Sequence, residues 1–201
     1  MPSSKDLIVE PVGVDVETLP HPIVFSRLFG NEHPVELEIG IGKGTFLTDQ
    51  AKARPDTNFF GIEYARWFWR YASDRLRRNG CLNARTARAE AVYFLKEFVP
   101  DSSLAVVHVY FPDPWPKQRH HKRRLIQPPF LLEIHRVLKP AGRLQIVTDH
   151  EEYFQQIQQA VRGSPLKEVE CNLSEVGTNF ERKYRREGRK FHSIAAIRVG
   201  G

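Results

Sequence analysis

The chain has 201 residues, of which 41% are hydrophobic and 27% are charged. This length and composition are typical of one folded domain with a substantial core, and they exclude a disordered chain and a collagen-like repeat. The longest apolar run, Leu104–Phe111, is too short to span a bilayer, no secretory segment opens the chain, and the two cysteines lie far apart. We therefore expect a cytoplasmic protein without membrane contact.

The positive charge of the chain is unevenly distributed. Lys and Arg number 30 against 24 Asp and Glu, a formal net charge of +6. Residues 117–124 and 182–190 together hold 11 of these cations and one of the acids, so the remainder carries 19 cations and 23 acids. A solvated basic face is the alternative for either segment alone. Two such segments on an otherwise acidic chain favour a polyanionic partner.

The predicted elements alternate between strand and helix from Val35 onward. Residues 1–33 contain four prolines and no sustained period, so we expect an N-terminal arm laid over a domain formed by residues 34–201. The expected strands cover 35–39, 58–62, 82–86, 104–111 and 143–148, and the expected helices 45–53, 65–78, 91–98, 128–138 and 151–162. A turn at 140–142 and a final hairpin within 166–199 complete the pattern. This alternation predicts an α/β fold with a central, mostly parallel sheet and helices on both faces.

A glycine-rich loop follows the first strand of this alternation. Gly40, Gly42 and Gly44 stand where such sheets bind ligands, and glycine lets the backbone turn sharply and come close to a ligand. Glu63 ends the next strand, where a carboxylate can accept hydrogen bonds from both ribose hydroxyls of a nucleoside. The glycine spacing differs from the pyrophosphate fingerprint, and Glu38 beside the loop would repel phosphates. The pattern therefore favours S-adenosylmethionine, which carries cations and no phosphate, over a nicotinamide dinucleotide.

A loop with three prolines, Phe111–Lys117, follows the most hydrophobic predicted strand. The prolines fix the backbone, so the loop presents Asp113 and Trp115 rigidly at the same edge of the sheet. The basic residues 117–124 come next, so an aromatic ring can pack on a base while cations hold phosphates. A purely structural loop is the alternative, but this position favours a functional one.

Other conspicuous residues receive structural interpretations. His120 and His121 are adjacent, lie among cations and lack Cys or acidic partners at ligand spacing, so we expect no metal site. His108 lies in mid-strand and is predicted to be a core histidine with satisfied hydrogen bonds. The aromatic residues within 67–71 are predicted to pack in the core, although one ring could flank an adenine.

These motifs resemble the tRNA (guanine-N7-)-methyltransferase family of the TrmB type. The matching segments follow the family's order through most of the chain: Leu37–Gly44, Gly61–Glu63, Phe111–Arg124, Thr148–Asp149 and Thr178–Glu181. The resemblance implies a Rossmann-like class I fold dependent on S-adenosylmethionine, with no metal. It also implies a tRNA (guanine(46)-N7)-methyltransferase activity that forms 7-methylguanosine in the variable loop.

The resemblance further implies which residues form the site. Asp113 would be the catalytic residue. The methyl donor would contact Glu38, Gly40, Gly42, Gly44, Glu63, Glu90 and Asp113. The guanine would contact Lys117, Asp149, Thr178, Phe180 and Glu181, and the RNA would contact Arg119, His120, His121, Lys122, Arg123 and Arg124. Glu90 replaces the family's usual aspartate, and Phe180 holds a position often occupied by tyrosine.

The acceptor chemistry fits this set of residues. Guanine N7 has an in-plane lone pair and no proton, so methylation needs alignment and charge stabilisation rather than a general base. We expect Asp113 to position the base and to stabilise its growing positive charge. The expected partner is tRNA, and the expected state is a monomer or homodimer without an obligate protein partner.

Two other functional classes remain open at this point. A small-molecule methyltransferase would use the glycine loop and Glu63 but would have no need of clustered cations. A non-catalytic RNA-binding domain would use the cations but would have no need of Glu38 and Glu63 beside a glycine loop.

Overall fold

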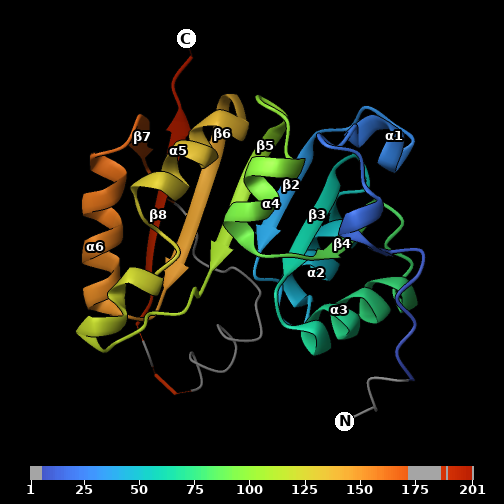
Figure 1. The fold of residues 1–201 in the computed structure, drawn as a ribbon, viewed down its shortest axis with the longest axis horizontal. Helices are drawn as coiled ribbons and strands as arrows, with labels where there is room; N and C mark the ends of the chain where they lie inside the picture. Colours follow the sequence, from blue (N-terminus) through green and yellow to red (C-terminus); the bar gives the residue numbers. More distant parts are fainter. Residues whose placement is uncertain (1–5, 172–186, 189, 201) are drawn as a thin grey trace.

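The structure, a computed structural model, describes residues 6–171, 187, 188 and 190–200. The described residues form an eight-stranded sheet in the order β1-β4-β3-β2-β5-β6-β8-β7 (Figure 1). Its strands are β1 (Gly13–Val14), β2 (Val35–Ile39), β3 (Asn58–Glu63), β4 (Ala84–Arg88), β5 (Leu104–Tyr110), β6 (Leu138–Thr148), β7 (Leu166–Val169) and β8 (His192–Arg198). Neighbours from β1 through β6 pair in parallel, and β8 pairs antiparallel with both β6 and β7. The predicted α/β fold with a mostly parallel sheet is confirmed.

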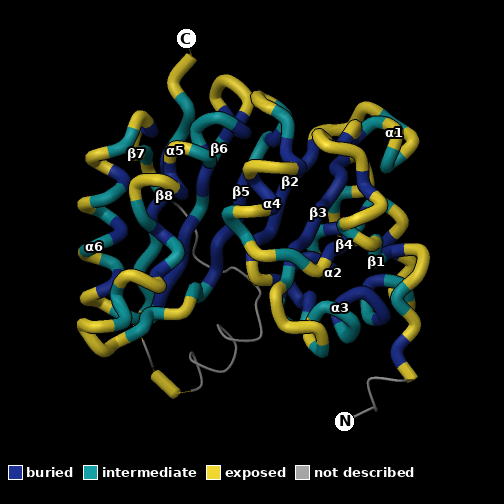
Figure 2. Tube along the Cα trace, viewed as in Figure 1, coloured by how far each residue is buried: buried dark blue, intermediate teal, exposed yellow. Residues whose placement is uncertain are grey.

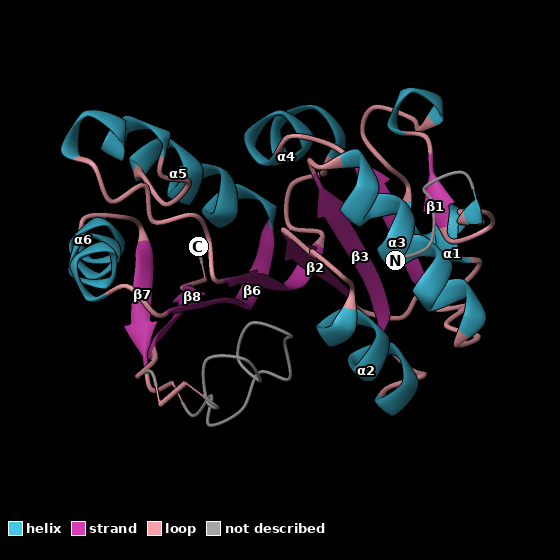
Figure 3. Cartoon of the chain, turned by 90° about the horizontal axis from the view of Figure 1, so that it is seen from below, coloured by secondary structure: helices cyan, strands magenta, loops and turns pink. Residues whose placement is uncertain are grey.

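Helices cover both faces of the sheet, and α5 and α2 lie on opposite sides of it in Figure 3. The helices are α1 (Phe25–Phe29), α2 (Thr45–Ala53), α3 (Arg66–Arg78), α4 (Ala91–Phe98), α5 (Pro128–Val137) and α6 (Glu151–Arg162). One apolar cluster joins α4, α5 and α6 to the sheet, and a second joins α2 and α3 to it. The strands are buried along most of their length, whereas exposed residues gather on the loops and outer helix surfaces (Figure 2).

Strand β2 shows how the sequence assigns side chains to these two faces. Successive residues of a strand point to opposite faces of the sheet. Leu37 and Ile39 accordingly join the cluster with α4, α5 and α6. Glu36 and Glu38 alternate with them and are also buried, at 6% and 3% exposure. Two carboxylates are thus placed inside the molecule, on the face covered by α2.

Part of the N-terminal segment belongs to the sheet and the core. Gly13 and Val14 pair with Thr86 and Ala87 of β4, so this segment supplies an edge strand. Val12 packs in the cluster with α2 and α3. Because a two-residue strand has no detectable period, β1 could not be predicted from the sequence.

Two expected elements differ from the structure. The turn expected at 140–142 falls inside β6, where pairing with β5 shifts register between Leu138 and Arg143 and Ala141 has a φ of 61°. The aromatic residues of 67–71 are predicted to pack in the core and are only partly buried: Trp67, Trp69 and Tyr71 are half-buried and Phe68 is exposed. The fully buried positions of α3 come later, at 72–74 and 76. Trp67 stacks on Tyr71 with 5.2 Å between ring centroids.

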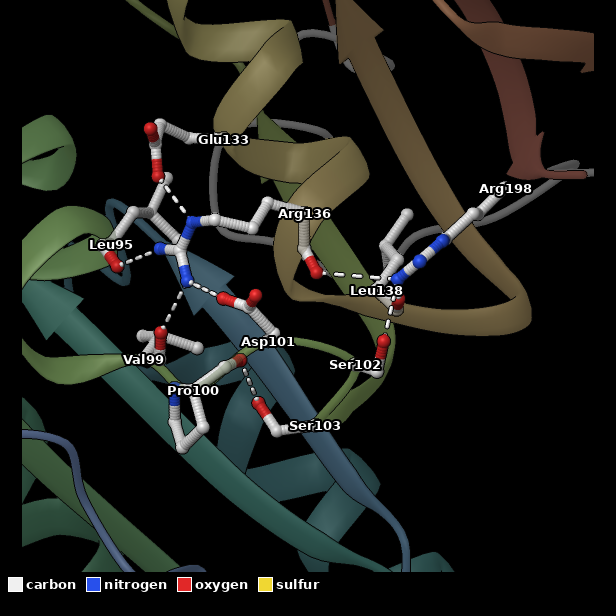
Figure 4. A network of polar contacts seen from close by, with 10 residues as sticks. All are labelled: Leu95, Val99, Pro100, Asp101, Ser102, Ser103, Glu133, Arg136, Leu138 and Arg198. Atoms are coloured by element: carbon white, nitrogen blue, oxygen red, sulfur yellow. Dashed lines mark hydrogen bonds and ion pairs between the residues drawn. The ribbon is translucent and has the colours of Figure 1, made fainter. Parts of the chain in front are cut away.

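Two arginines form hydrogen bonds between elements at the edge where the parallel strands begin (Figure 4). Arg136, at the end of α5, donates to the carbonyls of Leu95 and Val99 and to the carboxylate of Asp101. Arg198, at the end of β8, donates to the carbonyl of Leu138 at 2.6 Å. These contacts connect α4, α5, β6 and β8. The candidate site lies at the opposite edge of the sheet.

None of the helices in the described part of the chain is both long and apolar enough to cross a membrane.

Candidate active site

The site lies at the edge where the parallel strands end. In Figure 1 the arrowheads of β2, β3 and β5 all point to this edge. Ile39 of β2 stands in register with Ile62 of β3 and with Val109 of β5, so the strands end at nearly the same level. The strand order reverses between β2 and β5, which is where ligands bind in open α/β sheets. The fold therefore brings together the glycine loop, the acidic strand ends and the loop that follows β5.

The glycine loop connects β2 to α2 and is held by the neighbouring strand. Gly40, Gly42 and Gly44 have φ values of 81°, 50° and 67°, a region that strongly favours glycine. The amide of Gly40 donates to the carbonyl of Ile62 at 2.9 Å. A Cβ at Gly44 would lie 2.8 Å from Cβ of Ala72, whereas one at Gly40 or Gly42 would meet nothing within 4 Å. Gly44 thus permits close packing against α3, and the first two glycines face open space.

Glu63 braces this loop from the end of β3. Its Oε2 accepts a hydrogen bond from the amide of Gly42 at 2.9 Å, and its Oε1 accepts one from the amide of Ala65 at 2.9 Å. The carboxylate is therefore oriented before any ligand arrives. Each oxygen keeps a lone pair for a further donor, such as a ribose hydroxyl.

Glu38 lies in β2, just before the glycine loop, and is a buried ionisable group of the candidate site. Its Oε2 is buried and has no hydrogen-bond partner among the described residues. Burial, with a smaller contribution from the charge of Glu63, raises the pKa of Glu38 to about 8. A buried carboxyl without a partner is costly, and a cation placed beside it would remove that cost.

Glu36, on the same face of β2, belongs to a buried polar network that the sequence analysis missed. Arg54 contacts both of its oxygens, at 2.6 and 2.8 Å, and Nε2 of His108 lies 2.8 Å from Oε2. Burial alone would raise the pKa of Glu36, but the hydrogen bonds from His108 and Arg54 outweigh it and lower the pKa to about 2. The hydroxyl of Tyr110 lies 2.7 Å from Nδ1 of His108 and 3.0 Å from Oε1 of Gln145.

This network runs from Arg54, after α2, across β2 and β5 to Gln145 of β6. It includes Tyr110, the last residue of β5. It confirms His108 as a core histidine with both ring nitrogens engaged. The alternation of Glu36 and Glu38 with the apolar residues of β2 was the signal that could have revealed it.

The proline loop, Phe111–Lys117, follows β5 directly. Asp113 is exposed, and Trp115 is half-buried. Phe111 and Trp115 have φ values of 54° and 42°, which non-glycine residues rarely adopt. His120 meets the Trp115 ring edge to face at 5.9 Å, and the guanidinium of Arg123 lies over that ring at 4.9 Å. The loop and the cations that follow it are therefore packed together.

The basic segment, residues 117–124, folds mainly as a 3-10 helix, Gln118–Arg123. Lys117, Arg119, Lys122 and Arg123 are exposed, whereas His120 and His121 are half-buried. The exposed cations present positive charge beside the proline loop, as the sequence predicts.

Arg124 does not share this exposure, which corrects its expected RNA contact. Only 3% of the residue is exposed. Its Nε donates to the carbonyl of Pro114 at 2.7 Å, and its terminal nitrogens contact Gln156, Glu152 and His121. A buried guanidinium with these partners cannot reach a phosphate without breaking them.

The remaining expected residues are placed as follows. Glu90 follows β4 and caps α4, where its carboxylate accepts hydrogen bonds from the amides of Val92 and Tyr93 at 3.1 and 2.8 Å. Asp149 follows β6 and is half-buried. Thr178, Phe180 and Glu181 lie outside the described residues. No group of three or more His, Cys, Asp or Glu side chains in the described ranges could hold a metal ion.

Comparison with known proteins decides the family. Residues 32–194 match a family model described as "Putative methyltransferase". A tRNA (guanine-N(7)-)-methyltransferase of Bordetella parapertussis is 42% identical over 147 residues, which cover 73% of this chain and 58% of the relative. A protein of the same name from Alkalilimnicola ehrlichii is 34% identical over 193 residues, covering 94% of this chain and 81% of the relative. The chain belongs to the tRNA (guanine-N(7)-)-methyltransferase family. The resemblance stated from its motifs is confirmed.

Solved structures of other methyltransferases share the fold of this tRNA (guanine-N(7)-)-methyltransferase family member. The aminoglycoside resistance methyltransferase NpmB1 superposes with a TM-score of 0.62 at 22% identity, over 87% of this chain and 92% of NpmB1. An S-adenosylmethionine-dependent methyltransferase from Aquifex aeolicus superposes with a TM-score of 0.60 at 18% identity, over 87% of this chain and 88% of that protein. At these identities the likeness establishes the Rossmann-like class I methyltransferase fold alone. The chain spans 58% of the length of its Bordetella relatives.

Proposed function

We propose that this protein transfers the methyl group of S-adenosylmethionine to N7 of a guanine in tRNA, at position 46 of the variable loop. The observation that carries the proposal is the buried Glu38 carboxyl, whose Oε2 has no hydrogen-bond partner in the described part of the chain, in the strand that leads into a glycine loop held by Glu63. Family membership supports tRNA as the substrate class, and the motif resemblance supports the position.

The residues present fit the methyl donor. Glu63 would accept hydrogen bonds from the ribose hydroxyls, and Glu38 would stabilise the cationic amino-acid part. Gly40 and Gly42 leave space for the ligand, since a Cβ at either position would meet nothing within 4 Å. Glu90 and Asp113 complete the proposed donor-binding set, together with Gly44. When bound, S-adenosylmethionine supplies a methyl group activated by the adjacent sulfonium.

The guanine would lie against the proline loop. Because N7 carries no proton, the side chains must align the base and stabilise the positive charge that develops on it. Asp113 and Asp149 are suited to accept hydrogen bonds from N1–H and the exocyclic amine, which strengthen as that charge grows. Lys117 and, outside the described residues, Thr178, Phe180 and Glu181 complete the proposed guanine site.

The tRNA backbone would lie along the exposed part of the basic segment. Arg119, Lys122 and Arg123 offer charge to phosphates, and His120 and His121 add hydrogen-bonding capacity. We also propose a cytoplasmic monomer or homodimer without an obligate protein partner. Two free cysteines, Cys81 and Cys171, are consistent with a reducing compartment.

Methyl transfer to unmodified tRNA transcripts tests the proposal. Labelled S-adenosylmethionine is supplied, the RNA is digested to nucleosides, and a transcript with adenine in place of guanine at the target position serves as the control. We expect 7-methylguanosine from the first transcript and none from the second, and Asp113→Ala should abolish the product. Donor binding without any tRNA methylation would contradict the substrate and favour a small-molecule acceptor. Absence of donor binding would contradict the enzyme itself.

A further inference from the structure

Arg124 differs from every exposed cation of the basic segment because its side chain points inward. Its side chain is only 1% exposed, whereas Lys122 and Arg123 beside it are exposed. Burying a guanidinium is costly unless its donors are paired. Its partners therefore indicate what the residue does.

Those partners connect the proline loop to α6. Nε donates to the carbonyl of Pro114 at 2.7 Å, and one terminal nitrogen donates to Oε1 of Gln156. The other terminal nitrogen lies 3.2 Å from Oε1 of Glu152 and 2.9 Å from Nε2 of His121. A planar fork of this kind fixes direction as well as distance, which the single ammonium of a lysine cannot do.

The guanidinium of Arg124 packs on a buried aromatic ring of α6. The guanidinium lies 4.9 Å from the centroid of the Tyr153 ring, which belongs to α6 and is fully buried. The hydroxyl of Tyr153 accepts a hydrogen bond from the amide of Ile126 at 3.1 Å. Tyr153 thus holds the chain that follows Arg124, and its ring supports the guanidinium from below.

Two residues of the proline loop have backbone conformations that the surrounding structure must hold. Phe111 and Trp115 are in the left-handed region, and the three prolines of the loop have no amide hydrogen to donate. Strained conformations of this kind persist only where the surroundings hold them. The carbonyl that accepts the hydrogen bond from Arg124 belongs to Pro114, the residue between Asp113 and Trp115.

We infer that Arg124 is a positioning residue, which locks the proline loop onto α6 and thereby places Asp113 and Trp115, and that it makes no contact with RNA. The kinetic consequence of this inference rests on the proposed function. The structural consequence is independent of it.

The kinetic test replaces Arg124 with lysine, which keeps the charge and loses the fork. We expect kcat to fall by about 10²-fold, the effect of displacing a reacting group by about 1 Å. The dissociation constant for tRNA and its salt dependence should stay as in the wild type. The matched control is Arg119→Ala, for which we expect weaker tRNA binding and a slope of log K against log salt reduced by about 1.

A second variant covers the case in which Arg124→Lys does not fold. Gln156→Leu removes one acceptor of the guanidinium from α6 and changes no charge. We expect it to lower kcat in the same way, by less, with tRNA binding unchanged. If either Arg124→Lys or Gln156→Leu instead weakens tRNA binding and flattens the salt dependence while kcat stays constant, the inference is wrong.

A readout without tRNA separates this inference from the proposed function. The protein has three tryptophans, Trp67, Trp69 and Trp115, so 5-fluorotryptophan labelling gives three fluorine resonances, and Trp115→Phe assigns one of them. Arg124→Lys or Gln156→Leu should shift or broaden the Trp115 resonance and leave the other two in place. An unchanged Trp115 resonance in both variants would overturn the inference, whether or not the wild type methylates tRNA.

Discussion

At the scale of single residues, Glu38 and Glu63 show how one acidic pair can have two separate tasks. Glu63 has its oxygens aligned by the amides of Gly42 and Ala65. Glu38 is buried, and burial together with the charge of Glu63 raises the pKa of Glu38 to about 8. Near neutral pH and without ligand, Glu38 therefore holds a proton that a bound cation can replace.

The pH dependence of the free energy of unfolding should reveal this proton on Glu38. The pKa of Glu38 lies above its usual value of 4.5 in the folded state, so the folded protein binds the proton more tightly than the unfolded chain does. The free energy of unfolding should therefore decrease as pH rises from 4.5 to about 8 and level off above. Glu38→Gln should remove this slope, measured by urea unfolding across that range. The exposed Glu97→Gln is the control, and an equal slope in Glu38→Gln and wild type would refute the assignment.

The affinity for S-adenosylmethionine should change with pH in the direction opposite to that of the stability. Between about pH 6 and about pH 7.5 the α-ammonium of S-adenosylmethionine stays mostly charged, while Glu38 gradually loses its proton. We expect calorimetry to show affinity rising with pH in the wild type, and weaker, nearly pH-independent binding in Glu38→Gln. A pH-independent wild type would mean that the ligand's cation lies elsewhere.

Single residues also mark the limit of what the sequence reveals. The position of Glu63 near the glycine loop could be predicted, because Glu63 ends the strand that follows this loop in the chain. The structure adds its contact with Gly42. The burial of Arg124 depends on Gln156 and Glu152, which α6 brings back from about thirty residues later. The pairing of Glu36 with His108 depends on which strands become neighbours. The alternation within β2 indicates that Glu36 is buried but not which residue it pairs with, and nothing near Arg124 in the sequence indicates its partners.

At the scale of elements, the glycine loop is shaped by its fit against β3 as well as by its own conformation. A Cβ at Gly61 of β3 would lie 2.7 Å from side-chain atoms of both Ile41 and Leu47. Ile41 belongs to the glycine loop and Leu47 to α2. The absence of a side chain at this position of β3 therefore lets the loop and the helix sit close to the sheet.

Gly61→Ala should displace that loop. We expect a loss of stability of about 1–3 kcal/mol, typical of overpacking, with weaker donor binding because Ile41 must move. Gly163→Ala is the matched control, since its Cβ would meet only ordinary contacts, the nearest at 3.5 Å. The control should be neutral or slightly stabilising. Thermal unfolding and donor titration measure both effects, and equal behaviour of the two variants would contradict the packing argument.

Elements with strong local signals are those the sequence predicts well. Helix α2 lies between Gly44 and Pro55, and β2, α2, α4 and α6 have the predicted bounds. Strand β4 lies two residues later than expected, because its residues, Ala84–Arg88, carry little apolar pattern. The aromatic residues of α3 are buried less than predicted, since hydrophobicity alone does not reveal which face of a helix meets the sheet.

At the scale of the whole molecule, the two halves of the sheet divide the proposed ligands between them. The donor residues Glu38 and Glu63 belong to β2 and β3, and the proline loop and the basic segment follow β5. The halves meet where β2 pairs with β5. Asp113 follows β5 and is proposed to contact both ligands. Substitutions at the other proposed residues of either side should therefore affect one ligand at a time.

Kinetics with both substrates can test this separation. Glu63→Gln should raise KM for the donor by about 10-fold or more, the value of a hydrogen bond to a charged group, and leave tRNA binding unchanged. Replacing Lys122 and Arg123 by alanine should weaken tRNA binding and reduce its salt slope by about 1 for each lost phosphate contact, with donor affinity unchanged. An effect of the double variant on donor affinity would show that the two sites are coupled.

The buried network at the junction of the halves also bears on how long the folded protein lasts. Glu36 and His108 are 72 positions apart along the chain, so their contact closes a long loop. Because the entropy of closing a long loop opposes its early formation, we expect this contact to stabilise the native state more than the folding transition state. In stopped-flow experiments Glu36→Gln should therefore unfold faster, with a total loss of about 1–3 kcal/mol, and refold at nearly the wild-type rate. The lifetime of the native protein, more than the speed of its formation, should therefore depend on this one buried contact.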